Sequence, residues 1–304
     1  MTPQYLNDVR EVLCDFMRRM NITYPKVTYD SEFAQSCCEV ALRDDFLPGI
    51  VESPDFQLAL HGAVAIATTT FAHLENISTR QYICLYTTCL IYFDDLTKTD
   101  ASSVREFHTR FVSGRSQMHP LLDSYATLLR KAWEHFLPPC ANLVVSSSLD
   151  FINGLIVDHD QQQMTVNACA TSYPRWVRTM MGVSTAFVVF TFPPDVPLAS
   201  YIQIFPNMVS YIDDVNDLFS FYKEEAIHEG TNHISLLAQL SGKSKLQCMK
   251  ELAEYSIDGS HRCQTVLSAD QKALETYTQH FLPGYVAFHA AASKRYKLDD
   301  LHLG

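Results

Sequence analysis

The sequence is poor in residues that interrupt helices, with 10 Gly and 13 Pro among 304 residues. Long stretches contain neither residue, which favours helices. No stretch has the alternation of apolar and polar residues that is typical of strands, and there is no internal repeat or low-complexity tract. Since 47% of the residues are hydrophobic, the chain has enough apolar material for one sizeable core. We therefore expect an all-α bundle of about a dozen helices in a single domain over residues 1–304.

Positive charge is also scarce, with 23 Lys and Arg against 34 Asp and Glu and a formal net charge of −11. This balance argues against a nucleic-acid-binding protein. An acidic protein that binds an anionic substrate must supply local cations or metal ions. No apolar run reaches the ~20 residues of a membrane span, and the charged N-terminus is unlike a signal peptide. The expected location is cytoplasmic, so the sequons at Asn21 and Asn76 are expected to stay unmodified.

The nine cysteines include no CxxC pair, and their number is odd. Several lie in apolar runs, which favours reduced, buried thiols in an intracellular protein. The twelve histidines are scattered. His159 and His233 are not at metal-binding spacing from any cysteine, so solvated or structural roles are expected for nearly all of the histidines.

Apolar periodicity predicts the order of the helices. Ser53 and Ser78 are suited to cap the helices that follow them, residues 96–103 are expected to form a polar loop, and another polar loop is expected around Gly230. The helix over 175–190 is interrupted at Gly182, and the helix over 200–225 is kinked or restarted at Pro206. The predicted helices cover residues 4–20, 31–43, 54–72, 79–94, 106–137 (one or two helices), 142–167, 175–190, 200–225, 233–241, 243–257, 268–280 and 285–294.

The segment over residues 213–225, DDVNDLFSFYKEE, carries an unusual set of oxygen atoms. Asn216, Ser220 and Glu224 follow one another at intervals of four residues, so they fan over roughly 80° of one helix face. An amide, a hydroxyl and a carboxylate form a hard, weakly charged set of ligands that suits Mg²⁺. The alternative is an amphipathic helix whose polar stripe faces water.

A second pair of oxygen-bearing groups, Asp94 and Asp95, follows the apolar segment YICLYTTCLIYF and is expected to end its helix. Carboxylates in such a place are costly to desolvate unless a cation meets them. They could simply end the helix, but carboxylates at a helix C-terminus oppose the dipole. Across an apolar cavity, the two clusters could hold several Mg²⁺ ions on a diphosphate.

Several cations could hold the same diphosphate: Arg178 inside an apolar helix, Lys223, and Arg295 beside Tyr296. Arg178 could instead be a buried ion-pair partner of an aspartate, and the Arg295–Tyr296 pair could be an exposed basic tail. The implied reaction is departure of an anionic leaving group, with the carbocation held in a dry aromatic pocket. Whether the stripe of Tyr82, Tyr86 and Phe93 belongs to the pocket or to the core is left open.

Four segments resemble the class I terpene cyclases, and within them the fungal trichodiene synthase family. VNDLFSFYKE at 215–224 closely matches the NDxxSxxKE motif. IYFDDLTKTD resembles the aspartate-rich motif, WVRTMMG at 176–182 resembles the segment with the diphosphate-sensing arginine, and GYVAFHAAASKRYKL at 284–298 resembles the C-terminal stretch with its Arg-Tyr pair. The resemblance spans residues 91–298.

This resemblance implies the all-α terpenoid synthase fold around an apolar cavity, often as a homodimer, and cyclisation of farnesyl diphosphate to a sesquiterpene. Asp94, Asn216, Ser220 and Glu224 would ligate three Mg²⁺ ions on the diphosphate. Its oxygens would be held by Arg178, Lys223, Arg295 and Tyr296. No dedicated general base is implied, because diphosphate itself can take the final proton.

The chain departs from the family pattern at the aspartate-rich motif, whose fifth position is Lys98. Asp100 comes two residues later, so Asp94 remains the expected ligand and Asp100 is not expected to bind metal. Asp95 is expected to serve the local network more than the metal. Asp213 and Asp214 precede the second motif and match no ligand position.

Two other functions were weighed against cyclisation. A chain-elongating prenyltransferase would carry a second aspartate-rich motif where this chain has NDLFSFYKE. A non-catalytic isoprenoid-binding protein would have no need of intact Arg178, Lys223 and Glu224. Product identity depends on the shape of the pocket and lies beyond the sequence.

Overall fold

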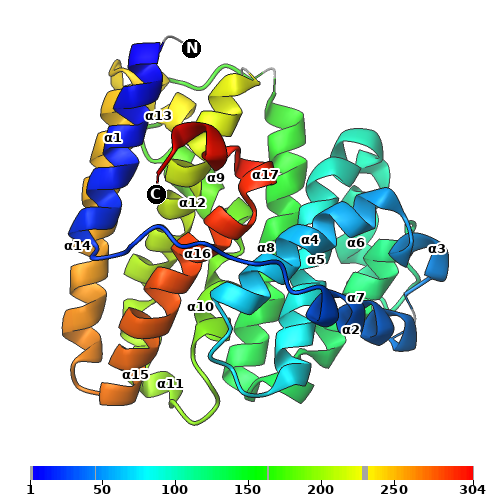
Figure 1. The fold of residues 1–304 in the computed structure, drawn as a ribbon. Coiled ribbons are helices and arrows are strands. Elements are labelled where there is room, and N and C mark those ends of the chain that lie inside the picture. The colour runs from blue at the N-terminus through cyan, green and yellow to red at the C-terminus, as the bar shows by residue number, and fades with distance from the viewer. Residues whose placement is uncertain (1–2, 45, 163, 228–231, 304) are drawn as a thin grey trace.

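A computed structural model describes residues 3–44, 46–162, 164–227 and 232–303 (Figure 1). Every regular element among these residues is a helix, which confirms the predicted all-α class. The expected loop around Gly230 lies outside the described residues. The first eight helices are α1 (Pro3–Arg19), α2 (Ser31–Arg43), α3 (Pro48–Val51), α4 (Pro54–Thr69), α5 (Ile77–Thr99), α6 (Ala101–Val112), α7 (Pro120–His135) and α8 (Pro138–Gln161).

The later helices are shorter on average and include two special segments. A 3-10 turn precedes α12, and a π-helix precedes α16. The elements are α9 (Tyr173–Gly182), α10 (Ser184–Thr191), α11 (Leu198–Tyr201), η1 (Ile202–Ile204), α12 (Phe205–Ala226), α13 (His233–Ser241), α14 (Lys245–Leu267), α15 (Gln271–Glu275), η2 (Thr276–Phe281), α16 (Leu282–Ala291), α17 (Ser293–Tyr296) and η3 (Leu298–Leu301).

Polar side chains cap many helix starts. Ser53 caps α4 as predicted, by accepting a hydrogen bond from the backbone amide of Phe56. The predicted cap at Ser78 is wrong. Asn76 caps α5 instead, and its side-chain oxygen accepts from the amides of Ser78 and Thr79.

The predicted end of α5 at Asp94–Asp95 is also wrong, because the helix continues to Thr99. The expected polar loop over residues 96–103 is instead the last turn of α5 and the first turn of α6, separated by Asp100. Asp100 caps α6 by accepting from the amide of Ser103 at 3.2 Å. Local polarity suggested a loop, but Leu96 and Thr97 are buried and hold the turn in the core.

Other boundaries differ from the prediction by up to ten residues, while two predicted interruptions are present. The helix predicted over 175–190 divides into α9 and α10 after Gly182, and α12 starts next to Pro206. The helix predicted over 243–257 extends as α14 to Leu267, and that over 142–167 is α8, which begins at Pro138 and ends at Gln161. The region predicted as a helix over 268–280 contains α15 and the π-helix η2.

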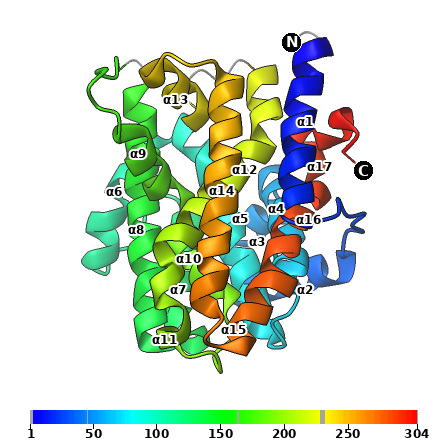
Figure 2. The same cartoon turned by 90° about the vertical axis from the view of Figure 1, so that its left-hand side faces the viewer.

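Helix α4 lies against α5 and α16 in the interior, and α12 lies between α14 and α10. Helices α1 and α14 run side by side at one edge (Figures 1 and 2). Almost all of α4 from Ala59 to Ala67 is buried, as expected for a central helix, although Leu58 is exposed. The apolar faces of these helices form one continuous core, and the oxygen-bearing faces of α5 and α12 point into a cavity within it.

One helix among the described residues, α8, is long and apolar enough to cross a membrane by length and composition. Half of its most apolar stretch is buried inside the protein, against α6, α7, α9 and α10. Core helices pass the same test, so this helix is weak support for a membrane span.

Substituting Gly284 with alanine is expected to destabilise the contact between α16 and α4. A Cβ atom at Gly284 would lie 2.6 Å from the carbonyl oxygen of Thr69 and 2.8 Å from the Cα of Thr70. Both are backbone atoms, so relief requires the helices to separate. We expect a loss of roughly 1–3 kcal/mol in unfolding free energy, measured by denaturant titration. Gly49→Ala, where a Cβ meets nothing within 4 Å, is the matched control and should be neutral.

Candidate active site

A cavity of about 700 Å³ opens between α5, α8, α9, α12 and the C-terminal helices. All eight residues singled out in the sequence line it, although they come from four helices and span about two hundred residues of chain. The set is Asp94, Arg178, Asn216, Ser220, Lys223, Glu224, Arg295 and Tyr296. The polar stripe of α12 therefore faces this cavity.

The lining combines a polar group of side chains with a predominantly apolar part. The apolar part comes from α4, α5, α8, α9, α10, α12 and α16, with aromatic rings contributed by α8, α10 and α16. Its side chains include Ile66, Leu90, Ile91, Phe151, Leu155, Val177, Met181, Phe187, Ile212 and Phe288. Such a cavity can hold a hydrocarbon chain with a charged head group.

Helix α5 contributes the first oxygen cluster. The side chain of Asp94 is half exposed, and Lys98 Nζ lies 3.8 Å from Asp94 Oδ2 and 2.9 Å from Asp95 Oδ1. Asp100 does not line the cavity. Its carboxylate accepts from the hydroxyls of Ser103 and Ser102, and these hydrogen bonds lower its pKa. Asp94 is thus available to a ligand in the cavity, whereas Asp100 is engaged at a helix start.

Helix α12 contributes the second cluster. Asn216 is held from both ends of its amide, because Oδ1 accepts from Arg178 Nη2 at 3.3 Å and Nδ2 donates to Tyr296 Oη at 3.0 Å. Ser220 is buried, and Glu224 lies on the same face with only 15% of its side chain exposed. Lys223 Nζ is 3.8 Å from Glu224 Oε1. Three oxygen-bearing side chains and one ammonium group therefore share one side of the cavity.

Arg178 both faces the cavity and binds buried carboxylates. Its Nε donates to Asp217 Oδ1 at 2.7 Å, its Nη1 to Asp213 Oδ1 at 3.3 Å and its Nη2 to the Asp213 carbonyl at 3.0 Å. Burial lowers the pKa of the guanidinium, but the two carboxylates outweigh burial and raise it above its usual value. Arg178 is therefore a buried ion-pair partner, as the alternative reading of the sequence predicts, and it lines the cavity as well.

Asp213 and Asp214 have a structural role that was not predicted from the sequence. Both are fully buried, and Arg175 pairs with Asp214 as Arg178 pairs with Asp213. Burial raises the pKa of Asp213 to about 6 and that of Asp214 to about 7, against the opposing effect of the arginines. The signal was present, because adjacent acids in an apolar helix need cations, and Arg175 and Arg178 are one turn apart.

Asp213 also reaches the break between α9 and α10. Its Oδ1 accepts from the Ser184 hydroxyl at 2.6 Å. A Cβ atom at Gly182 would lie 1.9 Å from that same oxygen, so only glycine fits. Val183 then takes a left-handed conformation with φ of 51°, which is uncommon for a β-branched residue. Asp213 thus joins Arg178 to a strained helix break that lines the cavity.

Oxygen and nitrogen atoms of Asp214, Asp217 and His233 lie within 4.8 Å of one another, which is close enough for a metal ion. His233 Nδ1 is 2.7 Å from Asp217 Oδ2. Arg175 and Arg178 already neutralise these carboxylates, so a divalent cation would meet two guanidinium groups there. This arrangement is consistent with a structural role for His233, although His233 also lines the cavity.

The C-terminal Arg-Tyr pair is more than a basic tail. Tyr296 is buried, with its ring edge-on to Phe288 at 5.7 Å, while Arg295 is exposed and lines the cavity. Burial raises the pKa of the Tyr296 hydroxyl, which keeps it a hydrogen-bond donor. The pair therefore brings one cation and one hydroxyl from the end of the chain to the α12 cluster.

The aromatic stripe of α5 belongs to the core. Tyr86 packs edge-on against Phe190 at 5.3 Å, Phe93 packs against Tyr125, and neither these residues nor Tyr82 line the cavity. The described aromatic residues that do line it come from other helices: Phe151, Phe187, Tyr285, Phe288 and Tyr296.

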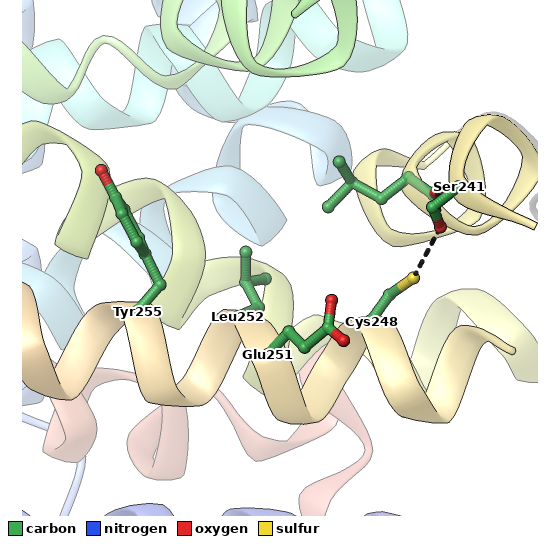
Figure 3. Close-up of a pocket in the computed structure, with 6 residues that line it drawn as sticks. Ser241, Cys248, Glu251, Leu252 and Tyr255 are labelled. Atoms are coloured by element: carbon green, nitrogen blue, oxygen red, sulfur yellow. Dashed lines mark hydrogen bonds between the residues drawn. The ribbon is translucent and has the colours of Figure 1, made fainter. Parts of the chain in front are cut away.

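A second, smaller hollow of about 170 Å³ lies between α13 and α14. Figure 3 shows Ser241 facing Cys248, with a hydroxyl–thiol distance of 3.7 Å, and Glu251, Leu252 and Tyr255 further along α14. None of the predicted site residues line it. The site residues predicted from the sequence therefore all line the larger cavity.

The trichodiene synthase (TRI5) family model matches residues 51–302 of this chain. The chain belongs to the trichodiene synthase family. This membership confirms the resemblance on which the site was predicted, and it makes the chain an enzyme of the terpene cyclase type.

Curated relatives align with this family member over nearly the whole chain. Alpha-cuprenene synthase COP6 of Coprinopsis cinerea is 30% identical over 97% of this chain and 90% of its own. Monoterpene synthase 25 of Postia placenta is 26% identical over 96% and 86%. Among solved structures, linalool/nerolidol synthase from Streptomyces clavuligerus, in complex with 2-fluorogeranyl diphosphate, has a TM-score of 0.62 at 12% identity and covers 91% of this chain and 98% of its own. That likeness supports the same fold.

Proposed function

We propose that this protein is a Mg²⁺-dependent sesquiterpene cyclase that acts on farnesyl diphosphate, releases diphosphate and closes the hydrocarbon chain into rings. One observation carries the proposal. Two oxygen clusters, three cationic side chains and a buried tyrosine converge on one cavity whose remaining wall is predominantly apolar. Farnesyl is the chain length that the family resemblance implies, and the cavity volume lies within the usual range for small-ligand sites.

The donor set fits magnesium. Asp94, Asn216, Ser220 and Glu224 offer two carboxylates, one amide oxygen and one hydroxyl, without a thiolate or imidazole among them. We propose that these residues hold three Mg²⁺ ions together with the diphosphate. When bound, such ions neutralise the charge that develops on a departing diphosphate.

The side chains around the clusters have complementary roles in this proposal. Arg178, Lys223 and Arg295 attract and orient the diphosphate, and the hydroxyl of Tyr296 donates to one of its oxygens. Because Arg178 donates to Asp213 and Asp217, binding of diphosphate competes with these carboxylates for its N–H groups. The apolar wall excludes water from the carbocation, and nearby rings stabilise it by cation–π attraction.

Incubation with geranyl, farnesyl and geranylgeranyl diphosphates tests the proposal, with mass analysis of the products and a diphosphate-release assay with and without Mg²⁺. We expect cyclic hydrocarbons from farnesyl diphosphate and no release without the metal. Longer prenyl diphosphates as products would instead indicate a chain-elongating prenyltransferase. Absence of turnover with all three substrates would contradict the proposal.

Asp94→Ala is expected to reduce turnover severely, and Asp100→Ala only mildly. Asp94 lines the cavity as a half-exposed carboxylate, whereas Asp100 lies at the start of α6. Asp100→Ala removes the N-cap of α6, so we expect it to lower the free energy of unfolding by about 1 kcal/mol. Rates of diphosphate release and thermal unfolding curves of both variants provide the comparison. Equal losses of activity would show that the aspartate-rich motif is wrongly placed.

A further inference from the structure

One residue that lines the cavity, Thr87, has a buried hydroxyl group without a partner among the described residues. Thr87 on α5 lines the cavity and is 4% exposed, and its Oγ1 makes no hydrogen bond to any described residue. The other threonines of α5 have partners. Thr88, Thr97 and Thr99 donate to the backbone carbonyls of the residues three or four positions earlier, and Thr79 Oγ1 lies 3.4 Å from His135 Nδ1. Backbone pairing is the usual state of a helical threonine, so Thr87 is the exception.

The other described hydroxyls that line the cavity are engaged. Ser184 donates to Asp213, Ser220 donates to the Asp217 carbonyl, and Tyr285 donates to the Ile212 carbonyl. Tyr296 is bonded to Asn216. A buried polar atom without a partner costs free energy, and the buried polar atoms of folded proteins are nearly all paired. The open partner position of Thr87 therefore suggests an interaction with something held in the cavity.

The distance of Thr87 from Asp94 along α5 determines which part of a bound ligand lies near Thr87. Thr87 precedes Asp94 by seven residues, which is two helical turns and roughly 10 Å along the axis. Both side chains line the cavity, as do Leu90 and Ile91 between them. A prenyl chain whose diphosphate lay beside Asp94 would therefore reach Thr87 with a part remote from the diphosphate.

We propose that the hydroxyl oxygen of Thr87 stabilises the carbocation centre that forms in the far portion of the substrate, and so determines which product is formed. This inference rests on the proposed function. Oxygen lone pairs attract a cation strongly in a cavity that excludes water. Oγ1 is buried in the structure, and rotation about χ1 to another staggered position can turn the hydroxyl toward the cavity without backbone movement. The contact is non-covalent and moves no proton.

Thr87→Val tests the proposal because valine keeps the shape and removes the oxygen. We expect the ratio of the two main products from farnesyl diphosphate to change roughly fivefold, the effect of one modest polar contact. Diphosphate release should fall far less than in Asp94→Ala, because the oxygen clusters are untouched. Thr87→Ser, which restores the hydroxyl, should return the product ratio toward that of the wild type.

Thr88→Val is the matched control, since its hydroxyl is paired with the backbone and the residue does not line the cavity. It should lower the melting temperature and leave the product ratio unchanged. Thr87→Val should not lower the melting temperature, because it removes an unpaired polar group. A lower melting temperature for Thr87→Val would show that the hydroxyl is paired after all and would overturn the proposal.

Binding of a charged probe provides a readout without turnover. A tertiary-amine analogue of farnesol, added with Mg²⁺ and inorganic diphosphate, should bind roughly fivefold more weakly to Thr87→Val than to the wild type. Equal binding and equal product ratios would overturn the role of Thr87 while leaving the cyclase function intact. A wild-type protein that releases no diphosphate would instead reject the cyclase function, and this inference with it.

Discussion

Glu224→Ala is expected to reduce magnesium-dependent diphosphate release on the order of a thousandfold or more, while the protein stays folded. Glu224 supplies the only carboxylate among the three proposed α12 ligands, the others being the amide of Asn216 and the hydroxyl of Ser220. Loss of the Glu224 charge weakens the binding of the cations, and with it the electrostatic stabilisation of the departing diphosphate. Steady-state release measured over a range of Mg²⁺ concentrations should show that excess metal does not restore the wild-type rate.

Glu225 is a closely matched control for this substitution. The side chains of Glu224 and Glu225 are 15% and 16% exposed, and both belong to α12. Glu225 does not line the cavity and pairs with Lys245 at 2.5 Å. Glu225→Ala should therefore affect stability more than catalysis. If both variants retained wild-type turnover, Glu224 would not be a metal ligand, whereas equal losses in both would indicate a general effect of removing charge from α12.

The members of each oxygen cluster could be predicted from the sequence because each cluster lies within one helix. Four-residue spacing places Asn216, Ser220 and Glu224 on one face whatever the remainder of the chain does. The same regularity made α5 recognisable as a buried helix before Asp94. Local rules therefore determine which side chains point in the same direction, and the family resemblance linked the separate helices to one cavity.

Partners that come from distant segments could not be predicted in the same way. The pairs Arg175–Asp214 and Arg178–Asp213 join α9 to α12 across more than thirty residues, and nothing in local spacing selects them. The sequence nevertheless contained a constraint, because buried acids require cations. The end of α5 was misplaced for a related reason, since tertiary burial of Leu96 keeps a polar-looking segment helical.

Gly182→Ala is expected to reduce turnover on the order of a hundredfold, although the residue belongs to neither of the two proposed metal-binding clusters. The new methyl group would meet Asp213 Oδ1 at 1.9 Å and the Ser184 hydroxyl at 2.8 Å. Asp213 is fully buried on α12, so it cannot swing into solvent to relieve the clash. The helix break must move, and the carboxylate that positions Arg178 must move with it.

The measurements should separate displacement of Arg178 from simple unfolding. Ser184→Ala removes the hydrogen bond to the same Asp213 oxygen without a clash, so it should lie between the wild type and Gly182→Ala in both activity and stability. Inorganic diphosphate with Mg²⁺ should protect wild-type protein from thermal unfolding more than it protects folded Gly182→Ala. Equal protection and unchanged turnover in the alanine variant would show that Asp213 does not couple the break between α9 and α10 to Arg178.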